Sequence, residues 1–335
     1  MNKKVYYAVL LVLVVAVAAF YFVNDRKRFI TTEGVVWTTE YHITYEANRN
    51  MADSIEVVLT RIDESASAYN QMSLVSQFNT TGEVVPDSLL NTLMQVSQGV
   101  YEKSEGAFDP TIMPLVQAYK KAAKAKRTPS QGYIDSLCTL VGFSKLKFEA
   151  GTIKAGVKGM ALDFSAVAKG LACDEVGRMF ERNGVVNYLV EIGGEVVAKG
   201  VNDRGTQWKV SVDLPSDQVD KTEHASAMVV ALDKASVATS GNYRQFAEVG
   251  GKRVTHIINP HNGKAEQSDL LSVTIIAPQC VSADAWATAC MAMGTKATQE
   301  LMESNDQLGV LTISADEQGN YVVWSNNAFT KCVPE

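Results

Sequence analysis

Residues 272–294, SVTIIAPQCVSADAWATACMAMG, decide the fold class. The stretch begins with a run of β-branched and apolar residues, which predicts a strand that Pro278 ends. Ser282 is placed to cap a helix at its N-terminus, and Gly294 is placed to end that helix. A strand that passes directly into a helix, among other segments of both kinds, predicts a mixed α+β globule.

Segments of both kinds surround this stretch. Residues 51–68 and 88–103 carry apolar side chains at spacings of three and four, which predicts two helices with one buried stripe each. A first strand is expected over residues 35–45, VVWTTEYHITY, because these are rich in β-branched and aromatic side chains. No segment repeats at a fixed period, which excludes solenoids and propellers. Further strands are predicted at residues 186–192, 208–213 and 228–232.

The N-terminus has the composition of a membrane segment. Residues 5–23 form an unbroken apolar run of 19, which as a helix spans about 28 Å and matches a bilayer core. Residues 16–18, Ala-Val-Ala, offer a signal-cleavage site, but the apolar run continues beyond them. We therefore expect residues 1–24 to be an uncleaved anchor and leave cleavage open. Basic residues on both sides of the run compete in setting its orientation.

The composition describes a folded protein and limits its partners. The 335 residues are 46% apolar and 20% charged, and 31 Lys plus Arg against 37 Asp plus Glu give a net charge of -6. A nucleic-acid binder usually carries a basic domain or stripe, so no nucleic-acid partner is expected. The five cysteines form no CxxC pair and have no histidine at metal-ligand spacing. We therefore expect mostly buried, inert thiols, not a zinc site or a disulfide framework.

Asp284 and Thr288 form the densest candidate site. They are four residues apart, so on a helix they share one face near its N-terminus and offer a carboxylate and a hydroxyl to one point. Oxygen ligands of this kind suit a hard cation such as Mg²⁺. The alternative is a capping Asp and a Thr bonded back to its own helix, with no metal.

A second candidate is residues 162–170, LDFSAVAKG, where a strand-like start turns through small residues into a helix that runs to Asn183. Such a turn leaves backbone groups available to an anionic ligand and its metal. Lys169 could approach a phosphate, and Asp163 could accept hydrogen bonds from a polar ligand. A solvated Lys and an Asp at a helix N-terminus are the alternatives.

Two further motifs are weaker when taken alone. The loop at residues 106–111, GAFDPT, presents Phe108 and Asp109, which could hold a ring system, but it is also an ordinary Asp-Pro turn. His256 comes just before a turn, NPHNG, and could be a general base. The alternative for a lone histidine in a strand is a half-buried structural residue.

Six blocks, taken in order, resemble the FAD:protein FMN transferases, also called the ApbE-like flavin transferase family. The resemblance covers about residues 33–330, and six blocks in the right order are far more specific than any one of them. The blocks are GAFDPT (106–111), LDFSAVAKG (162–170), VEIGGE (190–195), SVATSGNY (236–243), HIINPHNG (256–263) and ADAWATA (283–289).

The resemblance implies a catalytic domain over residues 33–330 with the mixed α+β fold of this family. It implies Mg²⁺-dependent transfer of FMN from FAD to a Ser or Thr hydroxyl of a target protein, with release of AMP. The family is typically tethered outside the cytoplasmic membrane, which agrees with the anchor and implies a periplasmic domain. Redox pumps of that membrane are the implied acceptors. Alternatives that keep the site are hydrolysis of FAD to FMN and AMP, and flavin binding without catalysis.

Site residues carry over from the family by position. The resemblance implies that Asp284, Thr288 and the backbone carbonyl of Ala166 hold Mg²⁺, with Asp284 also counted as catalytic. His256 matches the histidine of the family motif HII(D/N)P and is the candidate base for the incoming hydroxyl. The implied contacts to FAD are Tyr69, Ala107, Phe108, Asp109, Asp163, Lys169 and Ile258.

The chain departs from the family pattern at three places. Ser165 and Ala166 replace the usual glycine pair, and both are small enough for a close approach. Asn259 replaces the usual acid and carries no charge. Trp37 lies near the usual flavin-contacting Met and could stack on an isoalloxazine ring.

Overall fold

The structure is a computed structural model. It describes residues 27–215, 226–241, 246–249, 252–255, 257–265 and 269–334, together with five residues of the N-terminal segment. Within these residues, no helix combines the length and the apolar character needed to cross a membrane. The expected anchor, residues 1–24, lies almost wholly outside the described residues.

An eight-stranded sheet forms the centre of the molecule. Each strand runs antiparallel to its neighbours, so the sheet is built from hairpins and longer antiparallel connections. In sheet order the strands are β1 (Arg28–Val36), β2 (Thr39–Ala47), β6 (Tyr188–Ile192), β7 (Glu195–Lys199), β10 (Ala235–Gly241), β13 (Leu270–Ala277), β14 (Gly309–Ala315) and β15 (Tyr321–Ser325).

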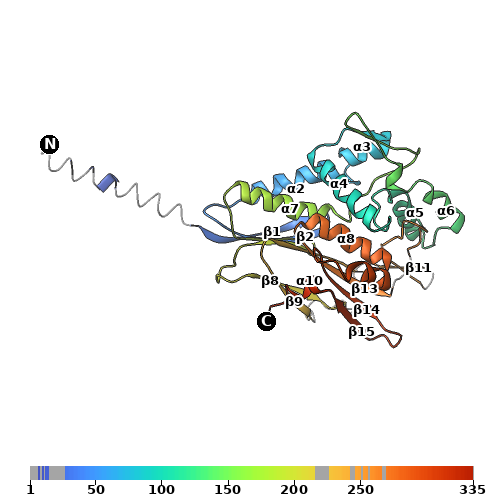
Figure 1. Cartoon of the computed structure of the whole chain (residues 1–335). Helices are drawn as coiled ribbons and strands as arrows, with labels where there is room; N and C mark the ends of the chain where they lie inside the picture. Colours follow the sequence, from blue (N-terminus) through green and yellow to red (C-terminus); the bar gives the residue numbers. More distant parts are fainter. Residues whose placement is uncertain are drawn as a thin grey trace.

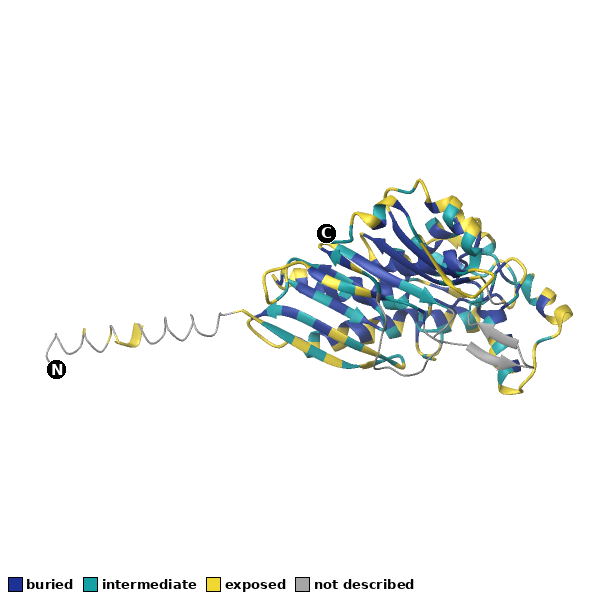
Figure 2. Ribbon diagram, turned by 90° about the horizontal axis from the view of Figure 1, so that it is seen from below, coloured by how far each residue is buried: buried dark blue, intermediate teal, exposed yellow. Residues whose placement is uncertain are grey.

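Helices cover one face of this sheet, and a hairpin covers the other (Figure 1). The covering helices are α2 (Ala52–Ala66), α4 (Ser88–Lys103), α7 (Ala168–Arg182) and α8 (Cys280–Met293), and their apolar sides form the larger core with the sheet. On the opposite face, β8 (Trp208–Asp213), β9 (Ser226–Leu232) and α10 (Asn327–Thr330) enclose a second apolar core. Figure 2, seen from below, shows the buried residues alternating with more exposed ones along the strands.

Smaller elements lie at the margins of these layers. Two helices, α5 (Met113–Lys124) and α6 (Gln131–Cys138), lie at the end of the molecule away from the start of β1 (Figure 1). The remaining elements are α3 (Leu74–Thr81), β3 (Glu83–Val84), η1 (Phe143–Lys145), β4 (Lys147–Glu149), β5 (Thr152–Lys154), β11 (Phe246–Val249), β12 (Lys252–Thr255) and α9 (Thr295–Met302). The mixed α+β class expected from the sequence is confirmed.

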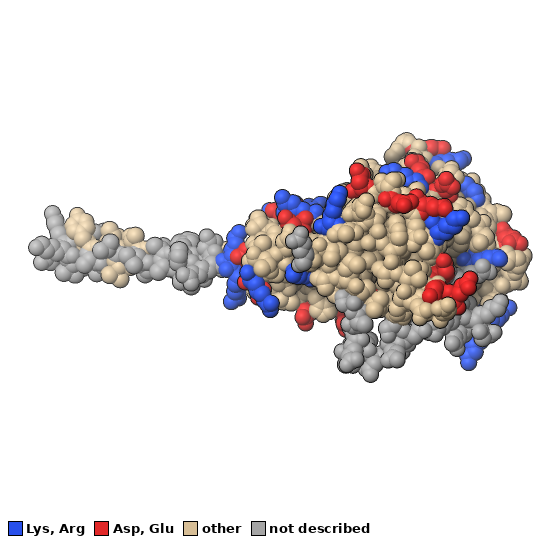
Figure 3. Space-filling view, turned by 60° about the horizontal axis from the view of Figure 1, so that its bottom comes forward, with Lys and Arg blue, Asp and Glu red and all other residues tan. Residues whose placement is uncertain are grey.

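The surface carries charges of both signs. On the face seen in Figure 3, basic and acidic residues gather toward the margins, and a broad area between them carries neither. All five cysteines are free. Cys173, Cys280 and Cys290 are buried and the other two are half-buried, as expected for thiols that pack like small apolar residues.

The single strand expected over residues 35–45 is wrong, because the chain reverses in the middle of it. β1 ends at Val36, β2 begins at Thr39, and Trp37 and Thr38 form the turn with φ of 48° and 67°. Two consecutive positive φ values are typical of a tight hairpin turn, and the residues that usually occupy such a turn are Asn-Gly. Here they are Trp and Thr, so the sequence contains no signal for a turn. The Trp37 indole Nε1 donates to Asp63 Oδ1 at 3.1 Å, a tertiary contact that stabilises this unusual turn.

Candidate functional site

Helices α7 and α8 pack antiparallel, and each supplies the cap of the other. Asp284 of α8 accepts a hydrogen bond through Oδ2 from the Gly170 N–H at 3.0 Å. Asp174 of α7 accepts from the Cys280 and Val281 N–H groups at 2.9 and 3.0 Å. These donors belong to the first turns of the two helices, where backbone N–H groups have no partner within their own helix.

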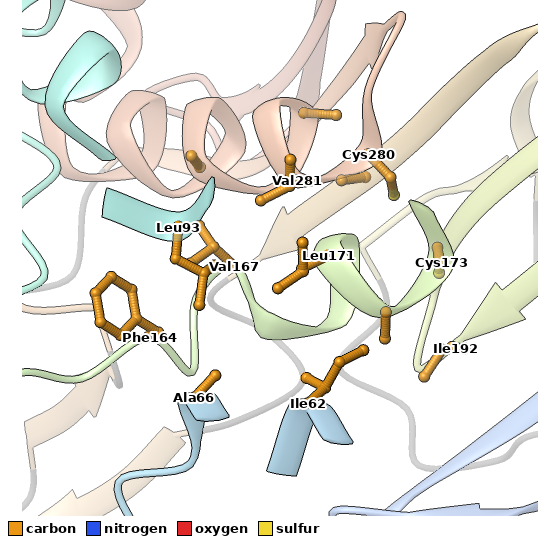
Figure 4. Close-up of a cluster of buried hydrophobic side chains, with 14 of the residues drawn as sticks. Ile62, Ala66, Leu93, Phe164, Val167, Leu171, Cys173, Ile192, Cys280 and Val281 are labelled. Atoms are coloured by element: carbon orange, nitrogen blue, oxygen red, sulfur yellow. The ribbon is translucent and has the colours of Figure 1, made fainter. Parts of the chain in front are cut away.

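Glycine at position 170 is what allows this close contact. A Cβ there would lie 2.5 Å from the Cys280 carbonyl oxygen and 2.9 Å from the Asp284 Cβ. Apolar side chains from three other helices pack around the start of α7 (Figure 4). They are Ile62 and Ala66 from α2, Leu93 from α4, and Val281 from α8. The beginning of α7 is therefore held firmly against the beginning of α8.

Ser282 does not cap α8, so this expectation is wrong. The helix begins at Cys280, and its N-cap residue Gln279 provides no side-chain cap. The cap is the Asp174 carboxylate, which lies 106 residues away from Cys280 in the sequence. Local spacing contains no signal for a cap from so far away.

Asp284 is buried, with 3% of its surface exposed. Burial raises the pKa of its carboxyl to about 6, against the opposing effects of the Lys169 charge and of the Gly170 N–H. Asp284 is thus a cap, but of α7 and not of its own helix. Thr288 lies one turn further along α8, half-buried, and its hydroxyl has no hydrogen-bond partner among the described residues. The expected alternative of a back-bonded Thr is not found there.

Lys169 lies in the first turn of α7 and pairs with a carboxylate that the sequence analysis did not single out. Its Nζ is 2.7 Å from Oε2 of Glu195, the first residue of β7, which is almost fully buried. Burial lowers the Lys169 pKa, but the charges of Glu195 and Asp284 outweigh this and raise it. Burial raises the pKa of the Glu195 carboxyl, and the charge of Lys169 opposes that rise, so the 2.7 Å contact with the ammonium favours the ionised form of Glu195. Glu195 is the last residue of the VEIGGE block. An acidic residue directly after two glycines is the feature of the sequence that could have marked it as a site residue.

The turn before α7 is ordered by Asp163. Its Oδ1 accepts from the Ser165 N–H at 2.8 Å and from the Ser165 hydroxyl at 2.5 Å. The Asp163 N–H donates to the Pro110 carbonyl at 2.7 Å, which joins this turn to the GAFDPT loop. Ala166 follows in the same turn and is half-buried.

Asp109 uses both carboxylate oxygens within the protein. Oδ1 accepts from the Thr111 N–H and hydroxyl at 2.8 and 2.6 Å, and Oδ2 accepts from the Phe143 N–H at 2.9 Å. Burial raises the pKa of this carboxyl, and these hydrogen bonds oppose the rise. Ala107 and Phe108 are buried beside it. The side chain of Asp109 therefore shapes the loop, and its expected contact with FAD stays a prediction.

The three remaining predicted site residues are Tyr69, Ile258 and His256, and they differ in exposure and in whether the structure describes them. Tyr69 is 57% exposed, and the Lys120 Nζ lies 4.4 Å from the centre of its ring. Ile258 is buried in a small apolar cluster with Leu115 and Ile134. His256 lies outside the described residues. Its assignment as the base stays a prediction.

The loop that follows His256 lies beside the GAFDPT loop. Asn259 Oδ1 accepts from the His261 N–H at 2.9 Å and so forms the turn. A Cβ on Gly106 would lie 3.1 Å from the His261 Cε1, which shows how near the two loops are. The structure thus brings together the blocks at residues 106–111, 162–170, 190–195, 257–263 and 283–289.

The available donors fit a hard cation better than a soft one. No group of three or more His, Cys, Asp or Glu side chains gathers around a possible metal position in the described part of the chain. The contacts 170 with 284 and 174 with 280 define an antiparallel register. Ala166 lies in the turn before α7, which begins at Ala168. Asp284 and Thr288 lie one turn apart on α8 and offer a carboxylate oxygen and a hydroxyl, which are oxygen donors that suit Mg²⁺. The Ala166 carbonyl as a third ligand stays a prediction.

The chain is similar to known proteins over most of its length. The ApbE family model matches residues 37–312. The FAD:protein FMN transferase of Vibrio cholerae is 31% identical over 298 residues, covering 85% of this chain and 87% of the relative. That of Escherichia coli K12 is 29% identical over 308 residues, covering 89% and 86%.

Solved structures show the same fold. The flavin transferase ApbE from Vibrio cholerae superposes with a TM-score of 0.81 at 26% identity, covering 92% of this chain and 100% of that one. The apo form of the Pseudomonas stutzeri flavinyl transferase ApbE gives 0.82 at 27% identity, covering 92% and 97%. The chain therefore belongs to the ApbE family.

Proposed function

We propose that this protein is an Mg²⁺-dependent FAD:protein FMN transferase, which moves FMN from FAD to a Ser or Thr hydroxyl of an acceptor protein and releases AMP. The observation that carries the proposal is the α7–α8 contact, where the buried Asp284 carboxylate accepts a hydrogen bond from Gly170 beside the Lys169 ammonium. Thr288 lies one turn further along α8. The relatives named above are FAD:protein FMN transferases, and they cover most of this chain.

Different residues would contact the metal, the pyrophosphate and the flavin. Asp284, Thr288 and the Ala166 carbonyl would hold Mg²⁺, which when bound neutralises charge on a pyrophosphate. Lys169 adds a cation beside the same place, and the first turn of α7 adds backbone N–H groups that favour an anion. The exposed Tyr69 ring is available to the flavin.

The transfer needs one nucleophile and one leaving group. The acceptor hydroxyl oxygen attacks the phosphorus on the FMN side of the pyrophosphate and forms a new P–O bond. The bond from that phosphorus to the bridging oxygen breaks, and AMP leaves with the bridging oxygen. His256 would take the hydroxyl proton. The enzyme itself forms no covalent bond in this scheme.

The decisive experiment uses the full-length chain in detergent with FAD, Mg²⁺ and a candidate acceptor, with and without a chelator. Acceptor mass and in-gel flavin fluorescence are measured together with free AMP. A chelator-sensitive gain of one FMN on Ser or Thr supports the proposal. Free FMN with an unmodified acceptor would support the hydrolase instead, and bound FAD without turnover would support a flavin-binding protein.

We also propose that the chain is anchored in the cytoplasmic membrane, with its catalytic domain on the periplasmic side and a redox-pump subunit of that membrane as the acceptor. The support is the apolar run at residues 5–23. Protease added to intact spheroplasts should digest the domain while the protein sediments with membranes. Protection in spheroplasts, or release into the soluble fraction, would contradict this placement.

A further inference from the structure

Two buried carboxylates act on the Lys169 ammonium. Glu195 Oε2 lies 2.7 Å from the Lys169 Nζ and forms its ion pair. Asp284 is near enough for its charge to raise the Lys169 pKa, yet within the described residues it forms no ion pair with this lysine. Of these two acids, Glu195 is the one that forms the ion pair with the ammonium.

We propose that Glu195 is a positioning residue, which holds the Lys169 ammonium away from Asp284 so that the Asp284 carboxylate stays available to a divalent cation. The inference rests on the proposed function for the identity of that cation. Glu195 itself contacts neither the metal nor FAD in this scheme. It acts through the position of Lys169.

Electrostatics explains why such a residue is needed. A lysine beside a buried carboxylate forms an ion pair with it, because the attraction is strong where water is excluded. Lys169 lies in the first turn of α7, where the helix dipole disfavours a cation, so its position depends on nearby acids. Without Glu195, Asp284 is the remaining acid that acts strongly on Lys169. An Asp284–Lys169 pair would occupy the carboxylate that the cation requires.

The turn between β6 and β7 is shaped to keep this pair in place. Gly193 has φ of 63°, and a Cβ on it would lie 3.1 Å from the Lys169 Cδ and 2.9 Å from the Thr39 Cγ2. Because the glycine has no side chain, the aliphatic part of Lys169 has room to pass this turn and reach Glu195. A larger residue would be strained in this conformation and would also displace the stem.

Glu191 fixes the same turn from the other side. Its Oε1 accepts from the Gly194 N–H at 2.6 Å, and its Oε2 pairs with the His42 Nδ1 at 2.9 Å. The Cys173 thiol donates to the Glu195 carbonyl at 3.2 Å, which ties the start of β7 to α7. The Glu195 side chain therefore starts from an ordered backbone.

The test measures metal binding in the full-length chain in detergent, without FAD. Mn²⁺ is the probe, and its free concentration is read by electron paramagnetic resonance. Glu195→Gln should weaken Mn²⁺ binding by about tenfold, because Lys169 then competes for Asp284. Glu195→Asp keeps the charge but shortens the side chain, and it should weaken binding similarly. Adding Lys169→Met to Glu195→Gln should restore the wild-type affinity.

A matched control comes from the other end of α7. Glu181 pairs with Lys199 at 2.5 Å, and Glu181→Gln should leave Mn²⁺ affinity unchanged. If Glu195→Asp bound Mn²⁺ as tightly as the wild type, the inference would be overturned, because a negative charge at this position would then be enough and the position of Lys169 would not matter. If the Glu195 single variants do not fold, Lys169→Met and the double variant still decide the question. Without the lysine, loss of Glu195 should not matter, and a weaker double variant would overturn the proposal.

The failure of this inference is distinguishable from the failure of the proposed function. FMN transfer by the wild-type protein, together with unchanged Mn²⁺ affinity in both Glu195 variants, would reject the role of Glu195 alone. Absence of any FMN transfer by the wild-type protein would reject the proposed function. The Mn²⁺ titrations would still show whether Glu195 governs access to Asp284.

Discussion

Asp174 and Asp284 cap each other's helices across the contact of α7 and α8. Each carboxylate accepts hydrogen bonds from the first turn of the opposite helix, at 2.9 and 3.0 Å for Asp174 and at 3.0 Å for Asp284. Asp174 uses both oxygens in this way. Asp284 uses Oδ2 and keeps Oδ1 for another partner. Both oxygens of Asp174 are therefore used in capping α8, whereas Asp284 has one oxygen left that could bind a ligand.

Asp174→Ala should destabilise the protein without touching a proposed ligand. The change leaves the Cys280 and Val281 N–H groups buried without an acceptor, which costs about 1–3 kcal/mol of unfolding free energy. Urea denaturation followed by circular dichroism measures the loss. Asp174→Asn keeps one acceptor oxygen and should lose less than Asp174→Ala. Equal stability of wild type and Asp174→Ala would contradict the role of this cap.

The stability contribution of Asp174 should depend on pH. Burial raises the pKa of Asp174 from 3.8 to about 6 in the folded protein. The folded state therefore binds more protons than the unfolded state between these values, so this group favours folding at low pH and loses that effect as the pH rises through about 6. The stability of wild type relative to Asp174→Asn should fall by about 2 kcal/mol between pH 4 and pH 7. A difference independent of pH would contradict the assignment.

Gly170→Ala should separate the two helices. The added Cβ would lie 2.5 Å from the Cys280 carbonyl oxygen, which is backbone and cannot rotate away. Thermal unfolding should show a loss of about 1–3 kcal/mol, typical of overpacking. Gly99→Ala, inside α4, is the matched control because a Cβ there meets nothing within 4 Å. That variant should gain about 0.5–1 kcal/mol from helix propensity. A stable Gly170→Ala protein would show that the contact can relax.

Sequence periodicity was sufficient for the elements that bury one stripe or one face. The helix expected at residues 88–103 has those bounds, and the helix expected at 51–68 is Ala52–Ala66. The strand expected at residues 208–213 is also found. In each case the local pattern and the tertiary burial agree, so local reasoning succeeds.

Where tertiary contacts decide, local reasoning failed. The Trp37–Thr38 turn has no glycine and is held by the Asp63 contact. The α8 cap comes from Asp174, and the importance of Glu195 appears only when β7 is placed beside α7. Pairing of Asp284 with Thr288 was predictable because it lies within one helix. Pairing between elements depends on packing that the sequence pattern does not contain.

Thr38→Gly should stabilise the β1–β2 hairpin. A β-branched residue at φ of 67° is strained, and glycine adopts this conformation without steric cost. We expect a gain of about 1 kcal/mol in unfolding free energy, measured by thermal unfolding. Thr31→Gly, in the middle of β1, should instead destabilise because it weakens a regular strand. A loss of stability in Thr38→Gly would mean that the Thr38 side chain makes a larger contribution than the strain.

Asp284→Asn and Thr288→Val should separate metal binding from folding at the proposed site. The amide oxygen of the Asp284→Asn variant would still accept the Gly170 N–H but would bind a divalent cation poorly, because it carries no charge. The Thr288 hydroxyl makes no hydrogen bond to another described residue, so valine of similar shape should leave stability within about 0.5 kcal/mol. Both variants should lower FMN transfer by on the order of 100-fold, with partial recovery at high Mg²⁺ for Thr288→Val. Ser282→Ala, on the same helix, is the control and should transfer FMN normally. Unchanged transfer in Asp284→Asn would place the metal elsewhere, and unfolding of that variant would mean that the Gly170 cap requires the charge.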